Sequence, residues 1–515
     1  MENSDRNKIS RSAIFSGLVS FHFLISVIMS LIARSTYLSG YHNGKGLWFF
    51  AMDSIEYNRQ AIQIAESLGN GMFYDWWWGT PFIHVNFISV FYFLIAPDPL
   101  SFAVVNAAIW AASVICVFHI ARVATLCSEK YALFIAAVYG LWPTGFLLTT
   151  QLLKDPFFNL GCLMVLLGWI SLLSGSARTR FVAIILAGYS LCIVIRPEPW
   201  PIFILVSIIA VLIIAVRARQ AFLYALLAFI LMTGFTATKN FVANAEISRN
   251  PLDAKRETDQ AAKHQINAES EKDKIEEIKR EAKAIIKDGY DEQLDKTLHT
   301  WLTDKRYAAR VWTIWERERI VRNLAKIHGA ALKDFLKKEM EPWEKTGWLP
   351  SSLEMAIYKV SRSRDSLLTY YAKASSFTLD SGVQFRNVYD VVKYIPRGIE
   401  IGFLAPFPNH WLTKSHTSGG ASRLLAGMEM IIWYILYAGF IFYCARSTID
   451  CGIKLWIIII CFAFVMSLGI FIPNIGTLYR MRFIYLAPVL VTGLEGLRML
   501  ISGFSFQKRL PANPL

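Results

Sequence analysis

Long apolar stretches alternate with short polar ones over most of this chain. About 20 consecutive apolar residues are enough for a helix to cross the ~30 Å hydrocarbon core of a bilayer. The pattern therefore predicts an all-α polytopic membrane protein with about ten transmembrane helices. The predicted spans are residues 12–34, 101–121, 131–150, 156–175, 181–195, 202–216, 220–239, 424–444, 454–473 and 483–502.

One apolar stretch does not fit this scheme. Residues 84–97 provide only about 14 positions, which are too few to cross the hydrocarbon core as a helix. We expect this stretch to be re-entrant or to lie in the membrane interface. The first span is long and lacks a small-residue cleavage site, so it is interpreted as a membrane helix and not as a cleaved signal peptide.

The predicted spans divide the chain into three parts. Residues 1–239 form an N-terminal membrane block with a large first loop at about 35–100, and residues 424–515 form a C-terminal membrane block. Between them, residues 240–423 are polar, and acidic and basic residues alternate from about 253 to 288, as in a solvated helix. Farther along this segment, apolar residues recur at helical spacing: Trp312, Trp315, Ile320, Leu324 and Ile327. We expect a helical insert here.

Lysine and arginine in the short loops predict the orientation. If the N-terminus is cytoplasmic and residues 84–97 do not span, the basic loop residues fall on the cytoplasmic side. They are Arg6, Lys8, Arg11, Arg122, Lys130, Arg178, Arg180, Arg217, Arg219, Arg446, Lys508 and Arg509. Both termini are then cytoplasmic, whereas the first loop and residues 240–423 are extracytoplasmic.

Charge and cysteine content exclude two other classes. The net charge of +14 is mostly explained by these loops, so it does not indicate a nucleic-acid partner. The seven cysteines lie in predicted spans or cytoplasmic loops, and their spacing matches neither a disulfide framework nor a metal site.

The first loop begins with a carboxylate just after the first span. Read as a helix, its sequence places Asp53 on one stripe with Tyr57, Ala61, Ile64 and Leu68, and the helix should end at Gly69-Asn70-Gly71. Asp53 could be an ordinary N-cap, worth about 1 kcal/mol. A functional role is favoured because the other unusual charges of the apolar regions fall on the same predicted side.

Three further predicted outer loops carry these charges. They contain Lys154-Asp155-Pro156, Arg196-Pro197-Glu198 and Tyr479-Arg480-Met481-Arg482. Taken singly, such residues can cap helices or extend toward the membrane surface. Together they match one chemical task, because a lipid-linked phosphate needs several cations and an attacking hydroxyl needs a carboxylate base.

The order of these features resembles the C-fold superfamily of membrane glycosyltransferases, which includes protein O-mannosyltransferases and the aminoarabinose transferases of lipid A. The matching positions are Asp53 and Tyr57 in a D-x-x-x-Y helix, Pro81, Arg122, Pro143, Asp155-Pro156 and Arg196-Pro197, within about residues 12–216. The family often has two adjacent acids at the first position, whereas here Ser54 follows Asp53 and Glu56 lies farther on. The insert at 240–423 matches no family with a defined substrate, which leaves the acceptor open.

The resemblance implies an inverting glycosyltransferase that takes a sugar from a polyprenyl-phosphate-linked donor and acts at the outer face of the membrane. The acceptor is a glycan, a lipid or a protein, and cell-surface polysaccharide assembly in a bacterial inner (plasma) membrane is the expected setting. Asp53 is the expected catalytic base. The expected substrate-binding residues are Tyr57, Glu56, Lys154, Asp155, Arg196, Glu198, Arg480 and Arg482.

No metal or other cofactor is expected, because arginine and lysine can stabilise the charge of a leaving phosphate. A divalent cation shared by Asp53 and Asp155 is the second-ranked alternative.

Three other functions fit parts of the sequence. A polysaccharide polymerase or ligase acting on lipid-linked oligosaccharides would use arginines in outer loops, here Arg397, Arg480 and Arg482. A transporter of a lipid-linked sugar would show repeat-related spans, broken helices and ionisable residues near the midplane, and the sequence shows none of these clearly. A non-catalytic scaffold would use the outer insert.

The orientation can be tested with reporter fusions. Fusions after Asn70 and Lys305 should report the extracytoplasmic side, and fusions after Cys127 and Arg219 the cytoplasm, because of the distribution of basic loop residues. A cytoplasmic signal from the fusion at Lys305 would contradict the orientation and the predicted side of the site.

Overall fold

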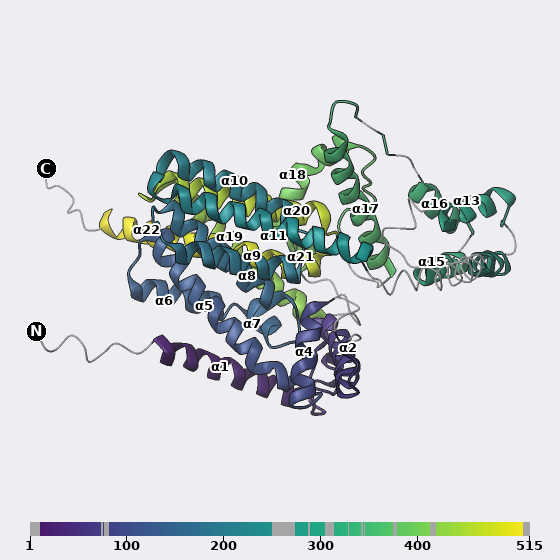
Figure 1. Cartoon of the computed structure of the whole chain (residues 1–515), viewed down its shortest axis with the longest axis horizontal. Helices are drawn as coiled ribbons and strands as arrows, with labels where there is room; N and C mark the ends of the chain where they lie inside the picture. The colour runs from purple at the N-terminus through teal and green to yellow at the C-terminus, as the bar shows by residue number, and fades with distance from the viewer. Residues whose placement is uncertain are drawn as a thin grey trace, which may run out of the picture. The chain divides into compact units, whose positions relative to one another are not determined.

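The structure is a computed structural model of the whole chain. It describes residues 11–73, 76, 82–249, 273–286, 289–303, 314–327, 329–340, 343–344, 346–373, 378–411 and 419–507. The sequence-predicted positions that lie outside this set are Arg6, Lys8, Pro81, Lys305, Trp312, Lys508 and Arg509. In the described ranges the only β-structure is two isolated bridges, so the predicted all-α class is confirmed there (Figure 1). The chain forms two compact units.

The first unit comprises residues 1–237, 371–379 and 395–515 and contains the apolar helices. They are α1 (Arg11–Ile32), α5 (Ala103–Thr125), α6 (Glu129–Gly140), α7 (Pro143–Thr149), α8 (Asp155–Leu173), α9 (Thr179–Ile195), α10 (Trp200–Arg217), α11 (Phe222–Arg249), α19 (Gly419–Arg446), α20 (Cys451–Phe471), α21 (Ile475–Tyr485) and α22 (Ala487–Gln507). Over the described residues, seven helices are long and apolar enough to cross a membrane, or nine if each of two bent helix pairs is one span. An integral membrane protein is therefore supported. The remaining predicted span, 181–195, corresponds to α9, which has 17 residues and is shorter than the helices counted.

Two pairs of apolar helices are bent. The first pair makes up the predicted span 131–150, whereas in the second pair the predicted span 483–502 follows a helix over residues 475–485 that was predicted mostly as an outer loop. The pairs α6–α7 and α21–α22 each turn by 66° at a short break. Each break precedes a proline, Pro143 at the start of α7 and Pro488 in the first turn of α22. Proline lacks the backbone N–H that would continue the preceding helix, and its ring clashes with the previous turn. The expectation that the chain has no clearly broken helices is wrong at these two places.

Side-chain contacts join loops that were predicted to share the cytoplasmic side. Arg217 at the end of α10 pairs with Asp450 before α20 at 3.1 Å, and the Tyr131 hydroxyl of α6 donates to the carbonyl of Leu494 in α22 at 2.8 Å. The Tyr443 hydroxyl of α19 donates to the carbonyl of Ala124 at the end of α5. These contacts agree with the predicted pairing of the helix ends, while the side of the membrane on which they lie stays a prediction.

Among the described residues of the first loop, two α-helices, α2 (Met52–Gly69) and α4 (Ile83–Leu94), pack against each other. As predicted, α2 ends at Gly69, and Gly71 takes the left-handed conformation, with φ +75, that favours glycine. With 12 residues, α4 is about 18 Å long, which is too short to cross the hydrocarbon core. Figure 1 shows both helices near the end of α1 that lies away from the N-terminus.

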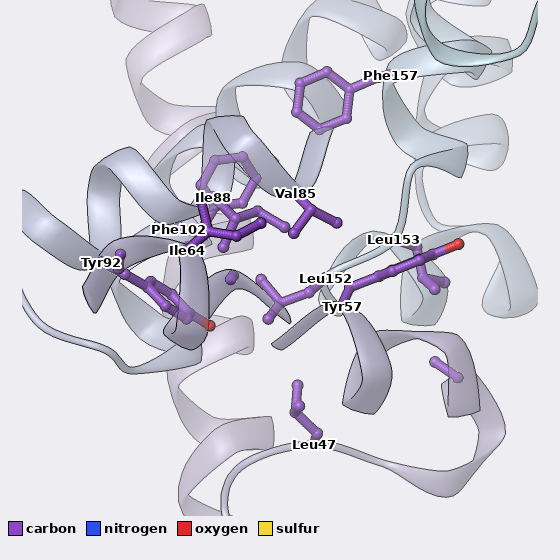
Figure 2. Packing of buried hydrophobic residues seen from close by; sticks show 13 residues of the cluster. Leu47, Tyr57, Ile64, Val85, Ile88, Tyr92, Phe102, Leu152, Leu153 and Phe157 are labelled. Carbon is purple, nitrogen blue, oxygen red and sulfur yellow. The ribbon is translucent and has the colours of Figure 1, made fainter. Parts of the chain in front are cut away.

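A hydrophobic core fixes these helices to the membrane block. Tyr57 and Ile64 of α2 pack with Val85 and Ile88 of α4 and with Leu152 and Leu153, which precede α8. Figure 2 shows Tyr57 reaching toward Leu153 within this core. The predicted stripe is thus confirmed at Tyr57, Ala61 and Ile64, but Ser54, not Asp53, is its buried first member. The core holds α2 against the start of α8.

The second unit comprises residues 238–370 and 380–394. It contains the helical residues 273–286 and α13 (Glu292–Thr303), α15 (Ile314–Ile327) and α16 (Gly329–Met340), which enclose a core that includes Ile278, Leu298 and Trp301. Ion pairs such as Lys274–Glu318 and Lys279–Asp295 link neighbouring helices. Two further helices, α17 (Ser351–Lys373) and α18 (Val388–Leu404), begin in this unit and end in the first. The predicted insert is helical over most of its described residues, but Ile327, which was predicted on a buried face, is 72% exposed. Its position outside the membrane stays a prediction.

Candidate functional site

Four segments that are distant in the sequence bring two carboxylates and two guanidinium groups together within the first unit. The Arg480 Nη2 atom lies 2.9 Å from Oδ2 of Asp53, and its Nε lies 3.3 Å from Oδ2 of Asp155. The Arg196 Nη2 atom donates to Oδ1 of Asp155. We call Asp53, Asp155, Arg196 and Arg480 the ion cluster. In it, Arg480 bridges the two carboxylates and Asp155 bridges the two guanidinium groups.

Local sequence rules explain where each member stands. Asp155 is the first residue of α8, immediately before Pro156, which is tolerated in a first helical turn. Arg196 precedes Pro197, which disfavours the helical conformation at Arg196 and ends α9 there, with φ −144 and ψ 95. Arg480 lies inside α21, whose start is capped by the Asn474 side chain accepting from the Thr477 N–H at 2.9 Å.

Asp53 does not cap α2. The N-cap residue is Ala51, which makes no side-chain capping bond, and Asp53 lies one residue inside the first turn, where its carboxylate pairs with Arg480. The N-cap interpretation of Asp53 is therefore wrong.

The members of the cluster differ in burial. The side chains of Asp155, Arg196 and Arg480 are 8%, 11% and 18% exposed, whereas that of Asp53 is 48% exposed. A buried charge is costly unless it has partners of opposite charge, which explains the double pairing of Asp155. Asp53 is the member that a substrate can reach most easily.

Lys154 adds a third cation beside the cluster. Its ammonium group lies 4.9 Å from the centre of the Phe82 ring. No ion pair joins Lys154 to a carboxylate of a described residue. Burial, and then the nearby Arg196 guanidinium, lower the pKa of Lys154, whereas Glu198 acts in the opposite direction. Glu198 is exposed. Lys154 is thus the cation at the site that is available to bind an anionic ligand.

Two buried side chains, Tyr57 and His84, lie near the charges of the ion cluster and Lys154. Their rings meet edge to face with centroids 4.4 Å apart, and both side chains are buried. Burial, followed by the charges of Asp53 and Asp155, raises the pKa of Tyr57, so its hydroxyl stays protonated. Burial, followed by the charge of Lys154, lowers the pKa of His84 to about 3, so its ring stays neutral near neutral pH. His84 was not selected from the sequence, where it only opens an apolar stretch and carries no spacing signal.

Two predicted site residues lie elsewhere. Glu56 is exposed on α2 and accepts a hydrogen bond from Arg59 at 2.6 Å, which is the largest cause of its lowered pKa. Arg482 is 1% exposed and donates to the carbonyl oxygens of Gly402 and Phe403, at the end of α18, at 3.1 Å each. Arg482 therefore joins α21 to α18 and does not face the ion cluster.

The space between the two carboxylates is occupied by a cation of the protein itself. The guanidinium of Arg480 contacts both Asp53 and Asp155, which were considered as ligands of a shared divalent ion. In the described part of the chain, no three His, Cys, Asp or Glu side chains are grouped as they would be around a metal ion. Carboxylates held by arginines can exchange places with a phosphate, because both anions accept the same pair of guanidinium hydrogen bonds.

Comparison of the chain with protein-family models, curated proteins and solved structures finds no match. The resemblance to the C-fold superfamily accordingly stays a prediction.

The different surroundings of Arg480 and Arg482 lead to a test of stability. Arg482→Ala removes the donor to the Gly402 carbonyl and leaves a cavity, which should lower stability by about 2–4 kcal/mol. Arg480→Ala should cost less, because Asp155 keeps Arg196 and Asp53 is half exposed. Thermal unfolding of the purified variants in detergent should therefore show a clearly larger drop in melting temperature for Arg482→Ala, and an equal or smaller drop would contradict these roles.

Proposed function

We propose that this protein is a membrane glycosyltransferase that transfers a sugar from a polyprenyl-phosphate-linked donor to an acceptor hydroxyl at the outer face of the membrane. The ion cluster is the observation that carries the proposal. It joins a half-exposed carboxylate to cations contributed by separate chain segments, beside a further cation without a carboxylate partner in the described residues. This is the set of charges that the reaction needs.

The reaction is a single displacement. The acceptor oxygen forms a bond to the anomeric carbon, while the bond from that carbon to the donor phosphate oxygen breaks and leaves its electron pair on the lipid phosphate. Asp53 receives the proton of the acceptor hydroxyl. Arg480, Arg196 and Lys154 stabilise the negative charge that grows on the leaving phosphate.

The pairing of Arg480 with Asp53 implies that the donor binds before Asp53 can act on the acceptor. A donor phosphate that binds Arg480 competes with the Asp53 carboxylate for the same guanidinium. Because Lys154 has no carboxylate partner among the described residues, it is the first cation available to the phosphate. Donor binding then separates Asp53 from Arg480 and leaves its carboxylate to the acceptor.

A second candidate is a transporter of a lipid-linked sugar. It is favoured by the two bent helix pairs and by Glu429, a carboxylate that is 2% exposed within α19. A transporter moves the donor across the bilayer without forming a glycosidic bond. Proteoliposomes loaded with a labelled polyprenyl-phosphate sugar distinguish the two, because only a transferase converts the label into a new glycoside. The polymerase or ligase hypothesis gains no comparable support, since Arg397 pairs with Glu400 at 2.8 Å on the same helix.

Replacement of the base tests the proposal directly. Asp53→Asn keeps the size of the side chain and removes its basicity, so transfer should fall by about 10²–10⁴-fold while membrane abundance stays normal. Glu56→Gln is the matched control, because Glu56 lies on the same helix and accepts its hydrogen bonds from Arg59 and Gln60 of α2. Full transfer activity of purified Asp53→Asn would exclude Asp53 as the base and direct the search to Asp155 or Glu198.

Removal of the cations tests the phosphate-binding role. Arg196→Ala and Arg480→Ala should each weaken use of the donor by about 2–5 kcal/mol, because each guanidinium is largely buried and a phosphate would desolvate it further. The measurement is donor kcat/KM at fixed acceptor concentration. Near-normal values for both variants would leave Lys154 as the remaining cation at the site.

A further inference from the structure

Glu429 is a buried acidic residue in a membrane helix, and its partners lead back to the ion cluster. Its carboxylate, in α19, accepts from the Thr144 N–H and from the Thr144 hydroxyl at 2.7 Å each. The third donor is the hydroxyl of Tyr479. Tyr479 stands immediately before Arg480 in α21. A carboxylate in such surroundings is retained only with donors of this kind, because an unpaired buried charge is costly.

Helix geometry makes the Tyr479 bond relevant to Arg480. Successive residues of a helix point about 100° apart, so the direction of the Tyr479 side chain determines the direction in which the Arg480 side chain leaves α21. Arg482, three residues farther on, lies on the same face of the helix as Tyr479, with its guanidinium 4.8 Å from the centre of the Tyr479 ring, and donates to the carbonyls of Gly402 and Phe403. With Tyr479 and Arg482 fixed, α21 cannot rotate without moving Arg480 away from Asp53 and Asp155.

We infer that Glu429 is a positioning residue: through Tyr479 it sets the rotation of α21 and thereby aims Arg480 at the two carboxylates and at the donor phosphate. The part that concerns the phosphate rests on the proposed function, whereas the part that concerns the carboxylates rests on the geometry. An error in placement of about 1 Å can cost ~10²-fold in rate, so this bond is expected to affect donor use although Glu429 touches no member of the ion cluster.

Cross-linking measures the position of α21 without any enzymatic assay. In a variant whose seven native cysteines are replaced, Asp53→Cys and Arg480→Cys give a pair that a short bifunctional thiol reagent can join. These substitutions remove the Arg480 ion pairs, which leaves Tyr479 and Arg482 to hold the helix. Adding Tyr479→Phe should slow cross-linking by about fivefold, the shift expected for the loss of one buried hydrogen bond.

Tyr434→Phe is the matched control. Tyr434 lies on α19, as Glu429 does, and its hydroxyl donates to the Leu404 carbonyl at 3.0 Å, so its loss removes one hydrogen bond between α19 and α18 and leaves the Tyr479–Glu429 bond in place. Glu429→Gln should behave like Tyr479→Phe, and the two changes together should slow cross-linking no more than either alone, because they break the same bond. If Glu429→Gln does not fold, Tyr479→Phe alone decides the question.

Binding of a polyprenyl phosphate to the otherwise unaltered protein completes the test. Tyr479→Phe should raise its Kd by about tenfold and Tyr434→Phe should leave it unchanged, because a hydrogen bond to a charged group is one of the stronger kind. Cross-linking that is as fast in Tyr479→Phe as in Tyr434→Phe would overturn the positioning role. Slower cross-linking in a protein that binds no polyprenyl phosphate would support the positioning role and overturn the proposed function.

Discussion

The carboxylate of Asp155 has to be buried at the point where α8 enters the apolar bundle. A buried carboxylate costs several kcal/mol unless cations and hydrogen-bond donors surround it. Arg196 from the end of α9 and Arg480 from α21 meet this requirement. The Nη2 atom of Arg480 also pairs with the carboxylate of Asp53 in α2. The need to neutralise one charge thus connects the first loop, the N-terminal membrane block and the C-terminal membrane block.

The orientation of helix α21 determines the direction in which Arg480 points toward the two carboxylates. Tyr479 and Arg482 share one face of the helix and Arg480 lies on another, and each has a separate partner: the Glu429 carboxylate, the C-terminal carbonyls of α18 and the ion cluster. Two of these contacts are fully buried and fix the helix, whereas the third faces the half-exposed Asp53. The bend before α22 contributes, because it lets α21 run in a direction of its own.

The sequence was sufficient to select all four members of the ion cluster, because apolar stretches mark where helices end and charges at those ends are easily recognised. It placed Asp53, Lys154, Asp155, Arg196 and Arg480 on one side, and the structure brings them together. It could not separate Arg480 from Arg482, since their divergence requires that residues 475–485 be a helix, on which positions two apart point in nearly opposite directions. The breaks before Pro143 and Pro488 were missed because average hydropathy carries no information on direction. Glu429 was missed because a single acid in an apolar stretch has no spacing pattern.

The contrast between the two carboxylates follows from their surroundings. Asp155 is enclosed and paired with both arginines, so its buried charge keeps one guanidinium if the other is lost and would be uncompensated only without both. Asp53 is half exposed and has one partner, so water can solvate it when that partner leaves. An anion that enters the site can therefore replace Asp53 at Arg480 at small cost but cannot replace Asp155. In the proposed reaction, this asymmetry makes Asp155 the holder of the two guanidinium groups and Asp53 the carboxylate that is released for chemistry.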